Sequence, residues 1–249
     1  MNSTRPDVAF LVQLAAALTV LGLAVGCQGE QTEGSPDAVP EAERQDAATE
    51  VEQALRDADW NRRLEAAWGL TERRDVAATA KVELLLAALE REIGDPTVAA
   101  SPHGTYLSTS EWIRFVYTRA LGESDSAGLE TLRTAAQEES GEKRARAILA
   151  LGYAGEAAVT PQLLELLRTS TVGDVRSDAA YLLGELGAQE AIPELRQALV
   201  ADAYVVAIES LAGGESDMYP VRVQAVRALK QLGLVLELTD DGQYRVVEP

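Results

Sequence analysis

Hydrophobic positions in residues 174–199 follow two short helical patterns in succession. In the first pattern Val175, Ala179 and Leu182 recur at steps of four and three, which places them on one face of a helix. The spacing is repeated over residues 192–199. Each helix would be about 12 residues long, which is marginally stable in water on its own. We therefore expect a helical hairpin that packs against neighbours on both sides.

The ends of these two helices carry residues suited to helix termini. Asp174 precedes the first pattern and is expected to accept hydrogen bonds from free amide groups there. Gly187 follows it, and glycine tolerates the left-handed turn that closes many helices. Pro193 lies in the first turn of the second helix, where a missing amide hydrogen costs nothing.

The pattern is repeated in earlier parts of the chain. Over residues 142–167, Arg144, Gly152, Gly155 and Pro161 each have the same residue 32 positions later. Three residue types in one register form a strong repeat signal.

Further copies complete the series. Residues 219–233 repeat the first helix alone, 111–132 resemble a full pair, and 59–90 form a divergent pair. The segment 41–58 has a helical pattern that could cap the first pair. The sequence thus predicts four helix pairs followed by a single helix.

The repeated pattern, VRxxAAxxLGxLGxxxAIPxLxxAL, resembles the HEAT repeat family and is closest to its HEAT-like type first associated with phycobilisome lyases. The resemblance covers roughly residues 59–233 and is sharpest in 142–233. It implies an all-α fold, a right-handed α-solenoid whose concave face is lined by the second helix of each pair. These repeats serve many unrelated functions, so the resemblance predicts the fold better than the activity. The residues that carry it are Asp174, Val175, Arg176, Ala179, Ala180, Leu183, Gly184, Leu186, Gly187, Ala191, Ile192, Pro193, Leu195, Ala198 and Leu199.

Two segments depart from the repeat. One is the loop 94–108, and the other is 201–218, which adds 14 residues before the last helix. The second is too apolar for a plain linker, and insertions in repeat proteins often lie on the binding face. We expect 201–219 to form either a projecting contact element or a lid over the end of the solenoid.

The tail 234–249 alternates apolar and polar residues around Asp241–Gly242, a pattern typical of a β-hairpin. Its apolar positions are Val235 and Leu238 before the turn, and Tyr244 and Val246 after it. A hairpin is unstable alone, so this one should cover the last helix as a C-terminal cap.

The first 27 residues resemble a bacterial lipoprotein signal. An apolar run ends in "LAVGC", and Cys27 is the only cysteine of the chain. The resemblance implies that 1–26 are removed as a signal peptide and that Cys27 is lipidated. The remainder would then face the periplasm or the cell exterior, in contact with the membrane through the lipid alone. A conventional cleaved signal, an uncleaved anchor and an inert thiol are the alternatives.

Between this signal and the repeats, residues 27–49 are polar, acidic and contain two prolines. They are typical of a flexible tether, followed by the solenoid at 50–233.

Reactive side chains are scarce. His103 is the only histidine and Cys27 the only cysteine, which excludes a Cys/His zinc site and a Cys–His nucleophile. No GxSxG, Walker or GxGxxG motif occurs. His103, between Pro102 and Gly104, is best interpreted as a solvated loop residue. We therefore predict no catalytic residue, no metal ligand and no cofactor.

The formal net charge is −18, which opposes binding to nucleic acid and favours a basic partner. The basic pairs Arg62–Arg63 and Arg73–Arg74 are expected to be solvated or paired with Glu65 and Glu72.

These observations predict an envelope-anchored, non-catalytic scaffold or adaptor that binds a protein or peptide. An enzyme or cofactor handler resembling the bilin lyases, and a permanent structural subunit of an envelope complex, are the alternatives. The sequence does not define which surface binds.

Overall fold

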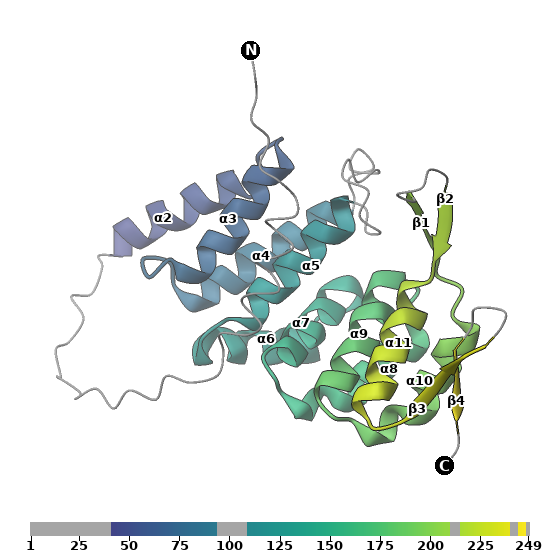
Figure 1. Ribbon diagram of the computed structural model, residues 1–249. Helices are drawn as coiled ribbons and strands as arrows, with labels where there is room; N and C mark the ends of the chain where they lie inside the picture. Colours follow the sequence, from purple (N-terminus) through teal and green to yellow (C-terminus); the bar gives the residue numbers. More distant parts are fainter. Residues whose placement is uncertain (1–40, 94–108, 210–214, 240–243, 248–249) are drawn as a thin grey trace, which may run out of the picture. The chain divides into compact units, whose positions relative to one another are not determined.

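Helices stacked in chain order make up most of the structure, a computed structural model that describes residues 41–93, 109–209, 215–239 and 244–247. The expected signal peptide, Cys27 and the loop with His103 lie outside these residues. Figure 1 labels the elements.

The four predicted helix pairs and the final single helix are all present, which confirms an all-α solenoid of HEAT-like pairs. The first helices of the pairs are α3 (Trp60–Glu72), α5 (Thr109–Gly122), α7 (Gly141–Tyr153) and α9 (Gly173–Glu185). Their second helices are α4 (Ala78–Ile93), α6 (Ser126–Glu138), α8 (Thr160–Thr169) and α10 (Ile192–Ala201). Short 3-10 turns, η2 (Ala157–Val159) and η3 (Gln189–Ala191), precede α8 and α10, and α11 (Pro220–Gln231) follows as the single helix.

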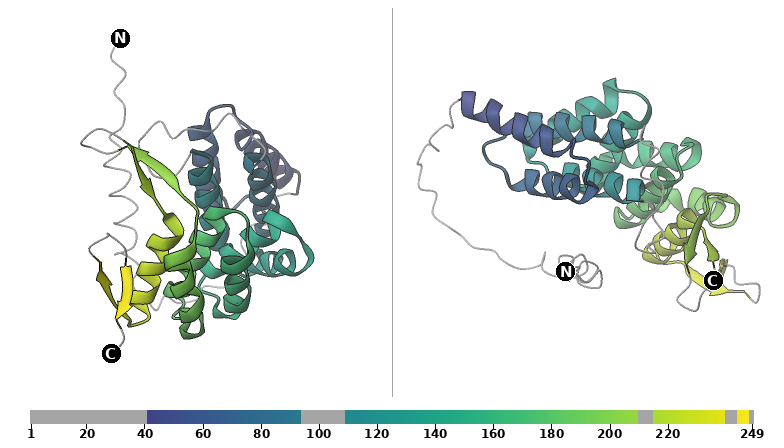
Figure 2. Two further views of the ribbon diagram at one scale, coloured as in Figure 1. Left: turned by 90° about the vertical axis from the view of Figure 1, so that its right-hand side faces the viewer. Right: turned by 90° about the horizontal axis from the view of Figure 1, so that it is seen from above.

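The helices form two layers, which can be followed in Figures 1 and 2. In the first layer α3, α5, α7, α9 and α11 pack in succession. In the second, α4 contacts α6 and α8 contacts α10. Each second helix also packs against the first helix that follows it. Buried leucine, alanine and valine side chains fill the space between the layers.

Glycines allow the first helices to approach closely. A Cβ atom at Gly122 would lie 2.8 Å from the Ala150 carbonyl oxygen of α7. One at Gly184 would lie 2.6 Å from the Cα atom of Ala228 in α11. The repeated glycine is therefore a packing requirement between neighbouring first helices.

The helix ends largely follow the prediction. Gly187 has φ of +68°, as its role at the end of a helix requires, and Pro193 lies in the first turn of α10. The expected position of Asp174 just before the helix is wrong, because α9 begins at Gly173 and the residue that precedes it is Val172. The Asp174 side chain does accept from the Val175 amide at 3.1 Å, but it is buried among arginines rather than capping the helix.

The helical segment predicted within 41–58 is present. Helix α2 (Glu41–Ala54) contacts α3 and α4 and buries Ala47 and Val51. The bound of the predicted tether at residue 49 is a correction, because residues 41–49 are helical.

The insertion 201–218 contains a β-hairpin of β1 (Val206–Glu209) and β2 (Glu215–Met218), paired antiparallel. Its base is held firmly. Asp202 accepts from Arg176 at 2.7 and 3.0 Å, and the Arg222 guanidinium donates to the Asp202 carbonyl oxygen at 2.8 Å. The Tyr204 ring packs over Gly173, where a Cβ would lie 2.2 Å from it. Beyond this base, the strands extend away from the helices in Figures 1 and 2.

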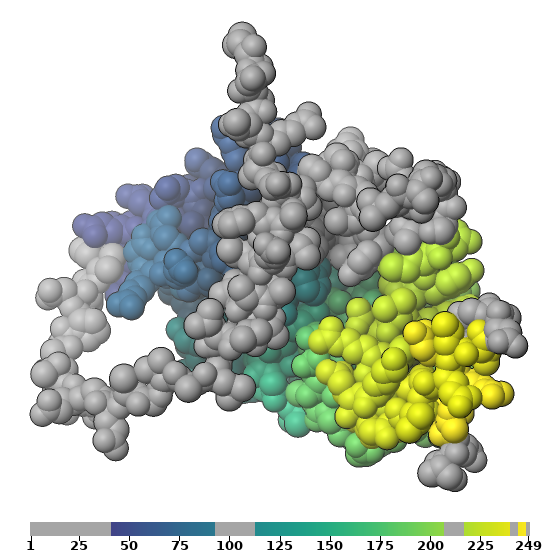
Figure 3. All heavy atoms as spheres, viewed as in Figure 1, coloured from purple at the N-terminus to yellow at the C-terminus, as the bar shows by residue number. Residues whose placement is uncertain are grey.

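The predicted C-terminal cap is confirmed. Strands β3 (Val235–Leu238) and β4 (Tyr244–Val247) pair antiparallel, and they contact α11 and α10 respectively. In Figure 3 the yellow C-terminal strands lie directly against the yellow-green atoms of α11. Leu236 and Val246 pack on the core, whereas Val235 and Leu238 stay 64% and 61% exposed. The inward position before the turn is therefore Leu236, which sequence alternation did not single out.

No helix within the described ranges is long and apolar enough to cross a membrane.

Candidate functional site

Three aromatic side chains form a row across successive first helices. The Phe115 and Tyr153 rings meet edge to face with centroids 6.1 Å apart, and the Tyr153 and Tyr181 centroids are also 6.1 Å apart. All three are half-buried, so each ring keeps part of its surface in contact with solvent. We call these three residues the aromatic row.

Arginines lie over two of the three rings, the middle one and the one on α9. The Arg119 guanidinium is 5.4 Å from the centre of the Tyr153 ring, and that of Arg227 is 4.6 Å from the centre of the Tyr181 ring. Both arginines are exposed. Glu185 accepts from Arg227 at 3.0 Å and from Gln231 at 2.6 Å. The result is a surface of adjoining aromatic rings and guanidinium groups that spans α5, α7, α9 and α11.

A buried ionic network lies in the same layer. Arg146 is fully buried and donates to Glu142 at 2.6 Å and to Asp174 at 2.7 Å. Arg114 also donates to Asp174, at 3.2 Å. Burial acts to raise the pKa of Asp174, but Arg146 and Arg114 outweigh it and hold that pKa below its ordinary value. This network ties three first helices together.

Asp178 has the opposite behaviour from Asp174, one helical turn away. Burial raises the pKa of Asp178 to about 7, in spite of the opposing charge of Arg146. The Tyr153 hydroxyl and the Arg119 guanidinium also act on it, both lowering its pKa. Asp178 therefore changes its charge near neutral pH directly beside the aromatic row.

One buried polar atom at this place, the Nη1 atom of Arg146, has no hydrogen-bond partner among the described residues. The Tyr153 hydroxyl is also buried, and it interacts with the Asp178 carboxyl group. Buried polar groups are rarely left without a partner. Burial also raises the pKa of Tyr153 well above its ordinary value, so its hydroxyl stays protonated and able to donate.

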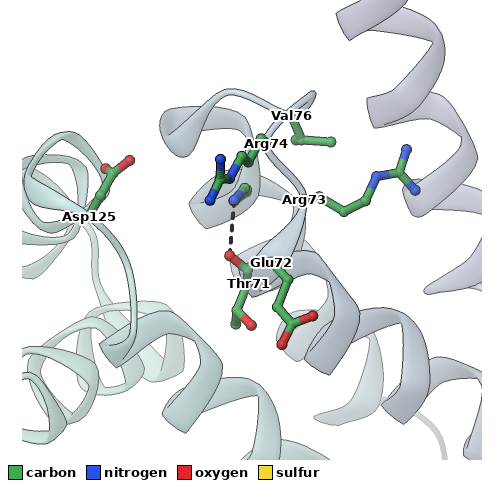
Figure 4. A pocket seen from close by; sticks show the side chains of 7 residues that line it. Thr71, Glu72, Arg73, Arg74, Val76 and Asp125 are labelled. Carbon is green, nitrogen blue, oxygen red and sulfur yellow. Dashed lines mark hydrogen bonds between the residues drawn. The ribbon is translucent and has the colours of Figure 1, made fainter. Parts of the chain in front are cut away.

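A shallow polar hollow of about 710 Å³ lies elsewhere, between the end of α3 and the start of α6. Lys81 donates to the Thr71 carbonyl oxygen at 3.3 Å, the dashed line in Figure 4. Asp125 lies opposite, but its carboxylate already caps α6 by accepting from two backbone amides. Arg73 points away from the hollow and pairs with Asp75 and Glu50. Most of the charged side chains that line the hollow are therefore already paired within the protein, and we assign the hollow no function.

The structure corrects the expected partners of the basic pairs. Arg63 is buried and forms two hydrogen bonds with Glu92, at 2.7 and 3.2 Å, instead of pairing with Glu65. Arg62 pairs with Asp57, and Arg73 pairs with Asp75 rather than Glu72. Of these pairs, the buried one between Arg63 and Glu92 joins α3 to α4.

The two residues with the most reactive side chains in the sequence, Cys27 and His103, cannot be assigned to a site. Cys27 and His103 both lie outside the described residues. Within those residues, no group of three or more His, Cys, Asp or Glu side chains is placed to hold a metal ion. The absence of catalytic, metal and cofactor residues stays a prediction.

Sequence reasoning missed the aromatic row. The repeat register gives no signal for it, because Tyr181 shares its repeat position with Leu149, and Tyr153 shares its position with Glu185. The contact between Tyr153 and Tyr181, however, joins two different repeat positions on neighbouring helices. It depends on the offset between those helices, which the repeat register alone does not specify.

Comparison with known proteins agrees with the fold. A family model described as HEAT repeats matches residues 100–184 and 129–213. Among curated proteins, none matches the chain. A similar solved structure is the complex of CpcE and CpcF of phycocyanin lyase from Nostoc sp. PCC7120. It has 21% sequence identity and a TM-score of 0.40, and the match covers 82% of this chain and 70% of that one.

Proposed function

This chain is a HEAT-repeat protein, and from that premise we propose that it is a non-catalytic adaptor that binds a partner protein through the surface around the aromatic row. HEAT repeats indicate a protein-interaction scaffold. We further propose that the adaptor is a lipoprotein of the bacterial envelope, anchored through Cys27.

The observation that carries the proposal is the combination of half-buried aromatic rings with exposed guanidinium groups that lie over them. Phe115, Tyr153 and Tyr181 offer ring surface, and Arg119 and Arg227 stack on that surface. Tyrosine and arginine are enriched at the energetic centres of protein interfaces. Such groups favour binding rather than bond breaking.

The overall charge supports a basic partner. At −18, the chain attracts a positively charged protein over a distance of about a Debye length. Association should therefore be faster at low ionic strength and slower at high ionic strength.

Arginine variants on each layer test the binding surface. The experiment captures the partner from native envelope extract with the full chain, and compares R119A with R168A. Arg168 is an exposed arginine of α8 in the second layer, so the two variants lose the same charge. We expect R119A to weaken capture of one stoichiometric partner and R168A to leave it unchanged. Equal capture by both variants would contradict the assigned surface.

The anchor is tested separately. Replacing Cys27 by alanine should release the protein from the membrane fraction and abolish metabolic labelling with a radioactive fatty acid. Retention of the label in the variant would exclude lipidation at Cys27.

A further inference from the structure

Helix α11 and the residues beside it differ from the rest of the chain in charge. The chain has a formal net charge of −18, but residues 218–236 contain three cations, Arg222, Arg227 and Lys230, and no aspartate or glutamate. Among the described helices, α11 packs mainly against α9 and α10. One side of α11 therefore stays at the surface, beside β3 and β4 in Figure 3.

The exposed side of α11 carries Val223, Arg227 and Lys230, which follow one another at steps of four and three. We call these three residues the α11 stripe. The buried residues of the helix pack in the core on its opposite side, and they are Val221, Ala225, Ala228 and Leu229. The stripe is thus an apolar side chain followed by two cations, all open to solvent.

Both cations of the α11 stripe lie over tyrosine rings. Arg227 lies over Tyr181 of the aromatic row. The Nζ atom of Lys230 is 5.3 Å from the centre of the Tyr244 ring of β4, and Leu238, opposite Tyr244 in the hairpin, is exposed. The stripe therefore connects the aromatic row with an exposed apolar side chain of the C-terminal hairpin.

The carboxylates that neighbouring elements bring to α11 are already paired. Glu185 of α9 accepts from the Nη2 group of Arg227 at 3.0 Å, and Glu237 of β3 accepts from Arg245 at 3.1 Å. Lys230 has no carboxylate partner among the described residues, and the other N–H groups of Arg227 have no acceptor there. The stripe therefore keeps positive charge and hydrogen-bond donors available for a ligand.

We propose that the α11 stripe binds an acidic segment of the partner protein, whose carboxylates reach Arg227 and Lys230 while an apolar side chain contacts Val223. The proposal rests on the proposed function, because the partner is the protein that binds the first-helix layer. A guanidinium group that stacks on a ring still presents the N–H groups of its edge, which suit a carboxylate. The net charge of −18 acts on the partner as a whole, so a partner that is basic overall can present an acidic segment here.

Two other anionic partners fit the α11 stripe less well. An amphipathic helix that binds a lipid surface buries its apolar face in the membrane, but the apolar face of α11 is already packed in the core. Nucleic acid binding depends on clustered cations, and the stripe has two cations in a chain of net charge −18. A protein segment needs only a few matched groups.

Two fluorescent peptides of equal length test the chemistry on the full chain in detergent. They share the same apolar residues and differ only in carrying glutamate or glutamine at the remaining positions. We expect the glutamate peptide to bind about tenfold more tightly, as measured by fluorescence anisotropy. The net charge of the chain repels this peptide elsewhere, so tighter binding identifies a local cationic site.

Charge variants test the α11 stripe itself. In R227Q/K230Q we expect binding of the glutamate peptide to weaken about tenfold, because both cations are gone. The matched control is R62Q/R168Q, which removes two exposed arginines from α3 and α8 and should leave binding unchanged. All four side chains are exposed, so both variants should keep the circular dichroism spectrum of the wild-type chain.

A photoreactive version of the glutamate peptide locates the site. Its crosslinks should map to residues 219–231 by mass spectrometry. Mixed micelles that contain phosphatidylglycerol test a lipid surface in the anisotropy assay, and they should leave the peptide bound.

Four results would overturn the proposal. They are equal affinity for the two peptides, equal weakening by the two double variants, crosslinks only outside residues 219–231, and displacement of the peptide by phosphatidylglycerol, which would assign the stripe to a lipid surface. None of these measurements involves Arg119 or the captured partner. A failed capture experiment with R119A would contradict the adaptor surface alone, whereas equal affinity for the two peptides would contradict the acidic segment alone.

Discussion

At the scale of single residues, the first-helix layer contains two aspartates with opposite electrostatic environments. Asp174 accepts hydrogen bonds from Arg114 and Arg146, so its charged form is stabilised. Asp178, one turn later on α9, is half-buried and has no equivalent pair of arginine donors among the described contacts, so desolvation penalises its charged form. The difference depends on the offset between helices, and both residues simply appear acidic in the sequence.

The pH dependence of stability should reveal Asp178. Its pKa of about 7 in the folded protein exceeds the ordinary value of 3.8. The folded state therefore holds a proton that the unfolded state loses, and stability falls as pH rises from about 4 to about 7. We expect D178N to lose this fall, so its free energy of unfolding relative to wild type should grow over that range. Urea unfolding at a series of pH values measures it.

Asp174 provides the matched control. Its pKa is lowered in the folded state, so its contribution to stability is present above pH 3.8 and is lost as pH falls through the folded pKa. D174N should thus destabilise the protein by a constant amount from pH 5 upward. If D178N and D174N showed the same pH profile, the assignment of the two environments would be wrong.

Arg146 should be among the most sensitive positions of the chain. It is fully buried and pairs with Glu142 and Asp174. In R146M both carboxylates would lose their buried partner, and such losses cost about 3–5 kcal/mol. Chemical denaturation measures the change. R144M, which removes an arginine in a partly exposed pair with Glu165, should cost under about 1 kcal/mol.

At the scale of elements, the packing of one first helix on the next depends on glycines. We expect G184A to destabilise by about 1–3 kcal/mol, because the added Cβ would lie 2.6 Å from the Ala228 backbone. In α3, Gly69 has no atom within 4 Å of its would-be Cβ. G69A should stabilise by about 1 kcal/mol, since alanine has the higher helix propensity. Thermal unfolding of both variants compares the two directly, and a stabilised G184A would contradict the packing account.

The hairpin insertion permits a test between a contact element and a lid. Replacing residues 206–218 with a short Gly–Ser linker keeps Asp202 and Tyr204, which make the contacts at the base. If the hairpin is a contact element, the melting temperature should hardly change. A lid would instead expose buried surface when removed, and the melting temperature would then fall steeply. D202A, which breaks the base, serves as the destabilised reference.

The helices could be predicted from the sequence, because hydrophobic periodicity marks them and a 32-residue register of glycine, proline and arginine aligns α7 and α8 with α9 and α10. Two features could not. Strands β1 and β2 are short and acidic in part. The partners of Arg63 and Arg146 lie on other helices, at sequence distances that no local spacing rule reaches.

At the scale of the whole molecule, the described helices form one continuous series in which each contacts its neighbours. In repeat proteins, stability is approximately a sum over repeats and the interfaces between them. The ionic network of Arg114, Asp174 and Arg146 spans three first helices, so it couples repeats beyond nearest neighbours. The same layer presents the aromatic row, so the proposed binding surface lies on the helices that this network joins.

The most direct test of the adaptor function is site-specific photo-crosslinking in living cells. Val223 lies one helical turn before Arg227 in α11 and is 50% exposed, whereas Val200, in α10 of the second layer, is 59% exposed. A photoreactive amino acid is placed at one or the other position of the full chain. The adaptor function predicts one defined crosslinked protein from position 223 and none from position 200. The same products from both positions, or none from position 223, would contradict binding through the first-helix layer.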